Sequence, residues 1–594
     1  MKYILKTSKP IKENFLNELL LDRGILKDDE DYNRKYFNPT RDCLLEPTLL
    51  DNMKKGFDMF KRHLENGSKI VFIVDSDVDG ITSSSAFINY INDNLKEKYP
   101  NIEITYILPE GKEHGLETKM DYFTNKKMCD LIICPDSSSN DYEEHRMLRN
   151  LGYDILVLDH HEAEKYSEDA VVINNQLSEN YENKDLSGAG VVYKFLQYCD
   201  KEFGINKADD YLDLISTGIC GDMMQLNNLE NRYITKKGFT EIRNGGLKAL
   251  ITAQEYSLFG TSFGFVNFSS IELTPTQIAF YIVPLMNALI RVGDLNKKEI
   301  LFKALLDGGE LIESTKRGEK GKMETVGEQN ARNCINAKAK QNREKEKTLE
   351  LLDIQIGNDC LDENKILFLR ADDLDVSNTL TGLCAMGVVA SYKKPTLLGR
   401  LNKEGYIKGS IRGVNGSELK DFKGFLLDSG LMDYVEGHAN SAGFSIKASN
   451  VDKLLEYANR ELVDVNFNEG CYEVDFVVKE DCPYLEKMIY SLDNGKNLWG
   501  QGNNEALVVV ENITIKSGDY SIIGKNRDTL RFTKNGITYI KFKATDFINE
   551  LAEKNGNIIL NICGRAAINE WNGIRKPQIL ITEAEIISNS KYEF

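Results

Sequence analysis

The sequence has few of the features that mark specialised proteins. Its 11 cysteines contain no Cys-x-x-Cys pair, and the closest two, Cys129 and Cys134, have no nearby partner ligands for zinc. We therefore expect reduced thiols and a cytoplasmic protein. No segment is apolar enough to cross a membrane, and the first residues lack the apolar core of a signal peptide.

Positive charge is also scarce. The 594 residues carry a formal net charge of -18, which argues against a protein that coats nucleic acid, because phosphate binding needs cations. One stretch departs from this balance, since residues 525–543 hold six basic side chains and one acidic side chain, Asp528. Both a solvated hairpin face and a narrow basic groove on an acidic body are compatible with this stretch.

Apolar runs alternate with helical segments in two separate parts of the chain, which predicts an α/β fold. The first part, between residues 69 and 173, is typical of a parallel sheet, and a β-rich tail after residue 507 suggests a small barrel. We expect five parts in chain order. They are an N-terminal helical segment (1–65), a parallel-sheet domain (66–300), a charged loop with a long connecting helix (301–360), a second α/β domain (361–465) and a C-terminal β-barrel (466–594).

Side chains that bind metals follow the apolar runs of the first part. The carboxyl ends of parallel strands meet at one edge of a sheet, so we expect these side chains to lie close together. Carboxylates combined with imidazole favour Mn²⁺ or Mg²⁺, and two such ions about 4 Å apart can neutralise a phosphate. The side chains are Asp75, Asp77, Asp136, Asp159, His160, His161 and, at the end of a helical run, Asp222.

Each of these groups taken singly has an ordinary explanation. Residues 75–80 resemble the start of a calcium loop, but Ala86 stands where that loop needs a glutamate. Asp136 and Asp222 alone are more typical of turns or helix caps. The pair His160-His161 alone is more typical of an ordinary surface or core pair. Because the ordinary explanations require four coincidences at one sheet edge, we expect a shared metal site.

Short segments along nearly the whole chain match one known family in order. Four of them are DSDVDG (75–80), Asp136, DHH (159–161) and GICGD (218–222). Six more are LSGAG (186–190), ENR (230–232) with Gly238, PLMNALIRVG (284–293), GHANSAG (437–443), WGQGN (499–503) and NEWNG (569–573). Together they resemble the motifs of the DHH/DHHA1 phosphoesterases, and within them the RecJ-type single-stranded-DNA-specific exonucleases.

The resemblance implies a role for each domain and for individual residues. It implies a DHH catalytic domain, a DHHA1 substrate-binding domain and an OB-fold-like nucleic-acid-binding domain. The implied metal ligands are Asp75, Asp77 (bridging), Asp136, His160 and Asp222. The implied catalytic residues are His161 at the scissile phosphate, Asp159 as the support of a histidine, and Asp79 as the support of the first motif. The implied substrate contacts are Asn287, Arg291, Ser410, Arg412 and His438. In the C-terminal barrel we expect Lys541 to contact the strand by charge, and Trp571, Phe532 and Tyr539 by stacking, although Trp571 fits the core of the barrel equally well.

The function that the resemblance implies is hydrolysis of single-stranded DNA, from 5′ to 3′, with two divalent cations, Mn²⁺ or Mg²⁺. The protein would act in DNA repair, recombination or replication. We expect a monomer that does not bind a membrane, with a single-strand-binding protein or a helicase as a candidate partner. Two alternatives stay open. One is a DHH phosphodiesterase for short oligonucleotides or RNA, and the other is a catalytically weak replication scaffold.

Three positions depart from the family pattern. Ser76 stands where the family usually has an aromatic residue, Leu285 where it often has arginine, and Glu436 where the GGH motif has its first glycine. None of them is an implied metal ligand. We expect these departures to affect substrate affinity, rate or length preference rather than metal binding.

Overall fold

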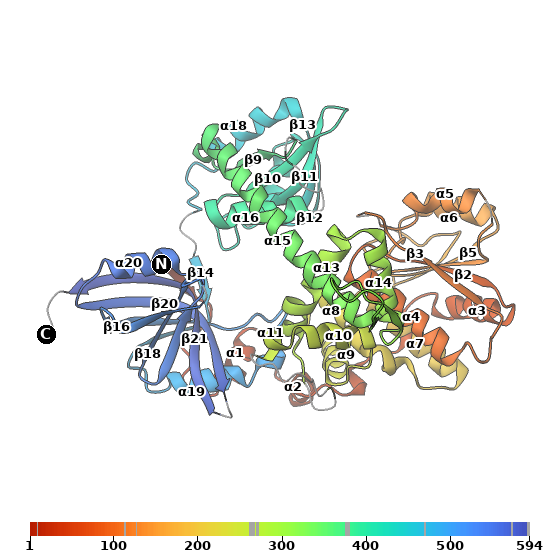
Figure 1. The fold of residues 1–594 in the computed structure, drawn as a ribbon, viewed down its shortest axis with the longest axis horizontal. Helices are drawn as coiled ribbons and strands as arrows, with labels where there is room; N and C mark the ends of the chain where they lie inside the picture. Colours follow the sequence, from red (N-terminus) through yellow and green to blue (C-terminus); the bar gives the residue numbers. More distant parts are fainter. Residues whose placement is uncertain are drawn as a thin grey trace. The chain divides into compact units, whose positions relative to one another are not determined.

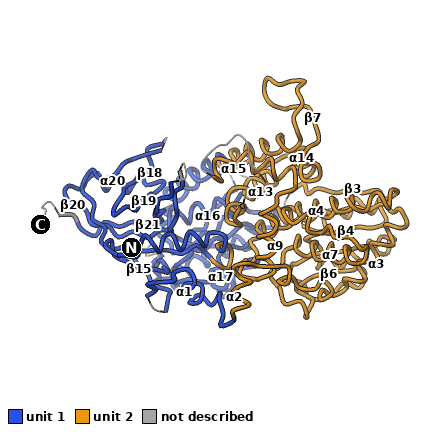
Figure 2. Tube along the Cα trace, turned by 90° about the horizontal axis from the view of Figure 1, so that it is seen from below, with its two compact units in different colours: residues 1–29, 343–498, 504–594 blue, residues 30–342, 499–503 orange. Residues whose placement is uncertain are grey.

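The computed structural model describes all residues except 9, 112–113, 126, 260–267, 269–271, 373, 375–379, 468–470, 525, 572–573 and 591–594. The chain forms two compact units, which Figure 2 shows in different colours. Unit 1 contains residues 1–29, 343–498 and 504–594, and unit 2 contains residues 30–342 and 499–503. Among the described residues, no helix is both long and apolar enough to cross a membrane.

A five-stranded parallel sheet organises unit 2. Its strands, in spatial order, are β3 (Glu103–Ile107), β2 (Lys69–Ile73), β4 (Leu131–Pro135), β5 (Asp154–Asp159) and β6 (Val171–Asn174). Side chains of β2 alternate between two cores, since Ile70 and Phe72 belong to one and Val71 and Ile73 to the other. Burial on both faces explains why the strands are continuous apolar runs.

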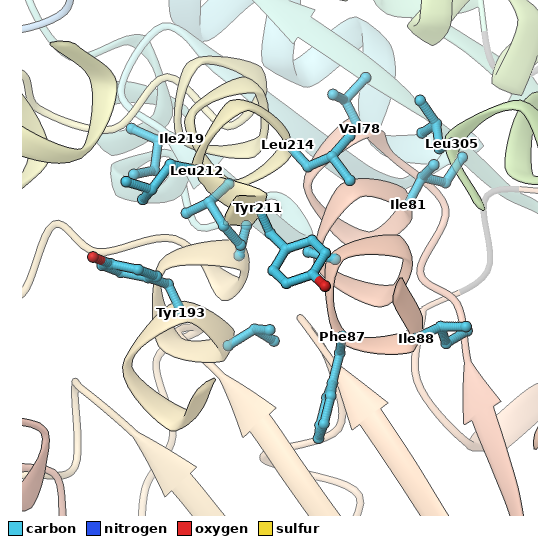
Figure 3. Packing of buried hydrophobic residues seen from close by; sticks show 14 of the residues in the cluster. Val78, Ile81, Phe87, Ile88, Tyr193, Tyr211, Leu212, Leu214, Ile219 and Leu305 are labelled. Atoms are coloured by element: carbon cyan, nitrogen blue, oxygen red, sulfur yellow. The ribbon is translucent and has the colours of Figure 1, made fainter. Parts of the chain in front are cut away.

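Helices cover both faces of this sheet (Figure 1). One face carries α3 (Met53–Glu65), α4 (Val78–Asn94) and α7 (Gly188–Phe203), and the other carries α5 (Met120–Thr124) and α6 (Tyr142–Asn150). The first face continues into a helical layer, in which α8 (Leu212–Gly221) packs against α4, α7 and α9 (Leu229–Thr240). Figure 3 shows the buried side chains of this layer, including Val78 and Ile81 of α4, Tyr193 of α7, and Leu212 and Leu214 of α8.

The rest of unit 2 is mainly helical. The N-terminal side contributes α2 (Glu30–Phe37) and the short helices η1 (Arg41–Cys43) and η2 (Pro47–Leu49). The C-terminal side contributes η4 (Ala208–Tyr211), α10 (Gly245–Ala253), α11 (Glu255–Phe259), α12 (Pro275–Gln277), the π-helical turn η5 (Ile278–Ile282), α13 (Val283–Val292) and α14 (Leu295–Leu306). The expected charged loop is a short hairpin of β7 (Leu311–Glu313) and β8 (Met323–Thr325). The expected long connecting helix is confirmed as α15 (Val326–Asn358), which continues into unit 1.

Unit 1 contains the second α/β domain. Its mixed sheet has the order β12 (Met432–His438), β13 (Ser441–Lys447), β11 (Tyr406–Arg412), β10 (Thr396–Leu401) and β9 (Leu367–Arg370), and only β9 and β10 run parallel among these pairs. Its helices are α16 (Thr381–Tyr392), α17 (Phe422–Asp428) and α18 (Val451–Glu461), with η6 (Leu361–Glu363) and η8 (Ala448–Asn450).

The β-rich tail of unit 1 forms a seven-stranded sheet. Its spatial order is β15 (Phe476–Lys479), β16 (Leu507–Lys516), β20 (Asn557–Trp571), β21 (Ile574–Ser590), β19 (Ile537–Lys541), β18 (Thr529–Lys534) and β17 (Tyr520–Ile523). The helices α19 (Leu485–Asp493), η9 (Lys496–Leu498) and α20 (Thr545–Ala552) accompany it. At the other end of the chain, β1 (Lys2–Leu5) pairs in parallel with β14 (Cys471–Val474), and α1 (Phe15–Asp22) follows. The first 65 residues are therefore not purely helical, because they begin with a strand.

Candidate metal centre

The carboxyl edge of the parallel sheet gathers the predicted ligands of unit 2. Asp75 and Asp77 follow β2, Asp136 follows β4, and His160 follows Asp159, the last residue of β5. Because β2, β4 and β5 are parallel neighbours, all of these residues reach the same edge. Asp222 joins them from the end of α8, which packs against α4.

The distances show that these side chains form one continuous cluster. His160 Nε2 lies 3.2 Å from Asp136 Oδ1 and 3.3 Å from Asp222 Oδ2. Three sets of side chains each have ligand atoms within 4.8 Å of one another, and Asp136 and His160 each belong to two of the sets. The sets are Asp136, His160 and His161; Asp79, His160 and Asp222; and Asp75, Asp77 and Asp136. The structure thus brings all five predicted metal ligands together.

The local backbone is arranged to present these groups. Asp77 is the N-cap of α4, and its Oδ1 accepts a hydrogen bond from Gly80 N at 3.0 Å. Asp136 has a φ of 65° and Ser138 a φ of 80°, a left-handed conformation that side chains other than glycine rarely adopt. Strain of this kind persists where the surrounding structure holds it, and it is concentrated at functional sites.

The charges of the cluster fit divalent cations. Burial raises the pKa of Asp75 and, together with neighbouring carboxylates, holds the pKa of Asp136 well above its usual range. Burial and the charges of Asp79 and Asp77 raise the pKa of Asp222 to about 8. Among the described residues, the buried Asp136 Oδ1 accepts no hydrogen bond, although His160 Nε2 lies 3.2 Å from it. A cluster of buried, mutually repelling carboxylates with an orphaned oxygen is the donor set that Mn²⁺ and Mg²⁺ require.

The two adjacent histidines differ in their charge. Asp159 is fully buried, and its Oδ1 lies 2.8 Å from both His161 Nδ1 and His160 N. Although burial alone would lower the pKa of His161, its bond to Asp159 raises that pKa to about 9. Burial lowers the pKa of His160 to about 4. At neutral pH His160 is therefore an uncharged imidazole suited to a metal, while His161 is a cation suited to a phosphate.

Asp79 links the first motif to the LSGAG segment. Its carboxylate accepts hydrogen bonds from Ser187 Oγ at 3.0 Å, Gly188 N at 2.7 Å and Ala189 N at 3.1 Å, at the N-terminus of α7. Burial raises the pKa of Asp79 to about 6. A Cβ at position 188 would overlap Asp136 Oδ1, so glycine is needed there for the helix to approach the metal cluster.

The ENR segment has a structural role behind the cluster. Glu230 is buried and accepts hydrogen bonds from Leu45 N at 3.0 Å, Lys194 Nζ at 3.0 Å and Tyr181 OH at 2.8 Å. The Arg232 guanidinium lies over the ring of Tyr36, 4.1 Å from its centroid. This segment therefore fastens residues 36–45 onto α9.

The WGQGN segment holds the chain that follows Asp222. Gln501 O accepts a hydrogen bond from Leu226 N at 2.8 Å, and a Cβ at Gly500 would lie 2.6 Å from Leu226. Residues 499–503 belong to unit 2, whereas the chain on either side of them, residues 343–498 and 504–594, belongs to unit 1. Their contacts explain why this short segment accompanies the catalytic domain.

The predicted substrate contacts fall in both units. In unit 2, Arg291 lies on α13, where burial lowers its pKa and the charge of Asp77 opposes that shift. Asn287 lies one turn earlier on the same helix. In unit 1, Arg412 and His438 both pair with Ser441, from opposite sides, so they form one row across the sheet. Ser410 lies on the same strand as Arg412, and its Oγ is 3.1 Å from Thr381 Oγ1.

The C-terminal sheet corrects part of the stacking prediction. Phe532 and Tyr539 are buried and stack on each other, with ring centroids 4.9 Å apart, so the prediction that they face a nucleic acid strand is wrong. Lys541 Nζ donates to Thr582 O at 2.9 Å and lies 3.8 Å from Glu583. Trp571 ends β20, but its side chain and Lys525 lie outside the described residues.

Two residues that sequence reasoning did not select stand out. Phe542 is 61% exposed, because β19 ends at Lys541 and the buried alternation ends with it. His114 Nδ1 lies 2.8 Å from Asp75 Oδ2. The apolar run at residues 102–108 was a signal for His114, since residues after it reach the same sheet edge as the ligands.

Comparison with known proteins agrees with this fold and site. The DHH family, N-terminal domain, matches residues 69–219, and the RecJ OB domain matches residues 487–583. A protein named "Putative SPbeta prophage-derived single-strand DNA-specific exonuclease YorK", from Bacillus subtilis (strain 168), is 37% identical over 599 residues that cover all of both chains. The single-stranded-DNA-specific exonuclease RecJ of the same organism is 26% identical over 597 residues, which cover 96% of this chain and 67% of that protein.

The solved structures show the same architecture. A crystal structure of RecJ in complex with Mn²⁺ from Thermus thermophilus aligns with a TM-score of 0.69 at 18% identity, over 96% of this chain and 75% of that one. The fold and the site define a phosphoesterase of the DHH class, as expected from the sequence. Within that class, the chain belongs to the RecJ family of single-strand-DNA-specific exonucleases.

Proposed function

We propose that this protein is a metal-dependent exonuclease that hydrolyses the phosphodiester bonds of single-stranded DNA. The observation that carries the proposal is the continuous cluster of Asp75, Asp77, Asp136, His160 and Asp222 at one sheet edge. Membership of the RecJ family supports the substrate class. The RecJ OB domain match supports a polymer substrate over a dinucleotide.

These five residues would hold two divalent cations, Mn²⁺ or Mg²⁺. RecJ of Thermus thermophilus has been crystallised in complex with each of these ions. When bound, the ions would supply Lewis-acid chemistry, which neutralises the phosphate and activates a water for in-line attack.

The chain's own residues would position and stabilise the reacting phosphate. His161 is cationic at neutral pH and about half exposed, so it can donate a hydrogen bond to a phosphate oxygen as negative charge builds there. Asp159 fixes the orientation of its ring through Nδ1. Arg291 would add a second cation, whose charge interacts with that of Asp77.

Unit 1 would bind the rest of the substrate strand. Arg412 and His438 form a row of phosphate-binding side chains on the second α/β sheet, residues 361–465. The C-terminal sheet offers exposed Arg531 on β18, and the exposed side chains of Phe542 and Lys543 follow β19. A basic surface with an aromatic platform is typical of single-strand binding.

We further propose 5′ to 3′ polarity and a cytoplasmic role of a monomer in DNA repair, recombination or replication. A single-strand-binding protein or a helicase is the kind of partner that would supply single strands. The scaffold alternative is disfavoured because all five ligand residues are present and lie together. The short-oligonucleotide alternative is disfavoured by the OB domain.

A digestion assay tests the proposal. We expect a long single strand to be degraded stepwise with Mn²⁺ or Mg²⁺ and to stay intact with EDTA, and we expect a blunt duplex to resist. A strand blocked at its 5′ end should resist, whereas one blocked at its 3′ end should be degraded. Faster cleavage of a dinucleotide than of the long strand would favour the short-oligonucleotide enzyme, and an intact strand with either metal would favour the scaffold.

A further inference from the structure

A histidine outside the four DHH motifs closes one side of the metal cluster. His114 lies between β3 and the short helix η3 (Glu117–Lys119). Its Nδ1 is 2.8 Å from Asp75 Oδ2 and 3.1 Å from Asp75 Oδ1. The Asp75 side chain is 1% exposed and that of His114 is 59% exposed, so the imidazole covers the solvent side of a buried carboxylate.

Described residues before and after His114 make specific contacts. Before it, the buried Lys298 of α14 donates to Pro109 O at 3.0 Å and Glu110 O at 2.8 Å. After it, Leu116 N donates to Asp141 Oδ2 at 2.8 Å, and Leu116 is fully buried. These contacts fix Pro109, Glu110 and Leu116.

Gly115 allows the turn that brings His114 to the cluster. Its φ of 67° is a conformation that favours glycine, and a Cβ there would overlap Asp141 Oδ2. His114 is therefore delivered to Asp75 by a constrained turn, which distinguishes it from an exposed histidine on a loose loop.

Asp75 needs such a partner because its carboxylate is crowded by other acids. Ligand oxygens of Asp75, Asp77 and Asp136 lie within 4.8 Å of one another. Among the described residues, His114 is the only side chain with a hydrogen bond to Asp75. An ionised carboxylate has about four lone-pair positions, so Asp75 can accept from His114 and still offer an oxygen to a metal.

We propose that His114 is a positioning residue for the metal centre: its Nδ1–H holds the Asp75 carboxylate in the orientation that binds a divalent cation. The inference rests on the proposed function for the identity of the cation and goes beyond it in naming the residue that orients this ligand. His114 carries out no chemical step itself. Partners of this kind change metal affinity about 10- to 100-fold when they are removed.

Three substitutions separate this role from others. An asparagine can place its amide nitrogen where His114 has Nδ1, whereas a glutamine places it nearer to where His114 has Nε2. His114→Ala removes both donors. Glu117→Ala is the matched control, because Glu117 is an exposed residue three positions further along.

The experiment measures Mn²⁺ binding to the full-length protein without DNA, by calorimetry and by the Mn²⁺ electron paramagnetic resonance signal. We expect about 10- to 100-fold weaker binding in His114→Ala and His114→Gln, binding within about threefold of wild type in His114→Asn, and no change in Glu117→Ala. Each metal-free variant should still unfold in one cooperative transition, which shows that any weaker Mn²⁺ binding does not come from loss of the fold.

Mn²⁺ affinity within twofold of wild type in His114→Ala would overturn the inference, and so would equal losses in His114→Ala and His114→Asn. A wild-type protein that binds Mn²⁺ with the expected order of variants, yet leaves single-stranded DNA intact, would overturn the proposed function and support the role of His114. A wild-type protein that does not bind Mn²⁺ would overturn both.

Discussion

At the scale of single residues, burial and Asp159 together give two neighbouring histidines different charges. It bonds the ring of His161, which stays protonated, while His160 is buried and stays neutral. Burial alone would raise the pKa of Asp159, but the bond to His161 and the charges of both histidines hold that pKa below its usual range. The bond to Asp159 on one ring and burial of the other thus give two identical side chains different charges at neutral pH.

The acidic residues of the cluster should destabilise the metal-free protein. Burial and four neighbouring carboxylates raise the pKa of Asp136. At any pH above the ordinary pKa of an aspartate, Asp136 therefore lowers the free energy of unfolding. We expect Asp136→Asn to raise the melting temperature in EDTA by about 2–4 °C, the effect of ~1 kcal/mol in a domain of roughly 200 residues. We also expect it to abolish both the rise in melting temperature that Mn²⁺ produces by binding and the nuclease activity.

Asp58→Asn is the control for this prediction. Asp58 is exposed on α3 and paired with Lys54, so its loss should leave both the EDTA and the Mn²⁺ melting temperatures unchanged. Scanning calorimetry with EDTA and with Mn²⁺ measures both variants. A normal Mn²⁺-induced rise in Asp136→Asn would show that Asp136 is not a ligand.

At the scale of elements, the strand ends and helix N-termini of unit 2 explain most of the motifs. The parallel sheet could be predicted because strands buried on both faces are continuous apolar runs, and β2, β4 and β5 have that form. The role of the LSGAG segment could not be predicted without a resemblance, because Gly188 and Asp136 are brought together only by the packing of α7 on the sheet. The hydrogen bond between His114 and Asp75 could not be predicted either, because it depends on the turn at Gly115.

Helix α6 contains a buried histidine that should make folding depend on pH. His145 is fully buried, and neither ring nitrogen has a hydrogen-bond partner among the described residues. Burial lowers its pKa below the ordinary 6.5, although the charges of Asp141 and Asp169 oppose the shift. Below pH 6.5 the unfolded chain takes up a proton that the folded protein does not, so stability is full above this pH and falls as the pH decreases.

We expect the wild type to lose more stability than His145→Leu between pH 7.5 and 5.5. The extra loss of unfolding free energy in the wild type should approach, and not exceed, about 1.4 kcal/mol for each pH unit below the ordinary pKa of a histidine. Urea unfolding at several pH values measures it, and the acidic cluster is common to both proteins, so its titration cancels. Parallel pH profiles for the two proteins would contradict a neutral buried His145.

At the scale of the whole molecule, the acidic balance of the chain restricts where DNA can bind. A net charge of -18 repels a polyanion, so binding depends on local cations and on stacking. The basic residues of the stretch 525–543 can be counted from the sequence, because charge needs no fold to be counted. The sequence did not identify the exposed ring of Phe542. It also did not show that Phe532 and Tyr539 point inward, because that depends on which face of β18 and β19 is covered.

Phe542 and Arg531 should contribute to strand binding in different ways. Phe542 is 61% exposed next to Lys543, and one base stacked on an aromatic ring is worth about 1–3 kcal/mol. We expect Phe542→Leu to weaken binding of a long single strand about 5- to 150-fold with no change in the salt dependence, and we expect Phe542→Tyr to bind like wild type. Arg531→Gln should instead reduce the slope of log affinity against log salt by about one phosphate contact. Fluorescence anisotropy in EDTA, over a series of salt concentrations, separates the two effects without cleavage. Equal affinities of Phe542→Leu and Phe542→Tyr would show that this ring does not stack on DNA.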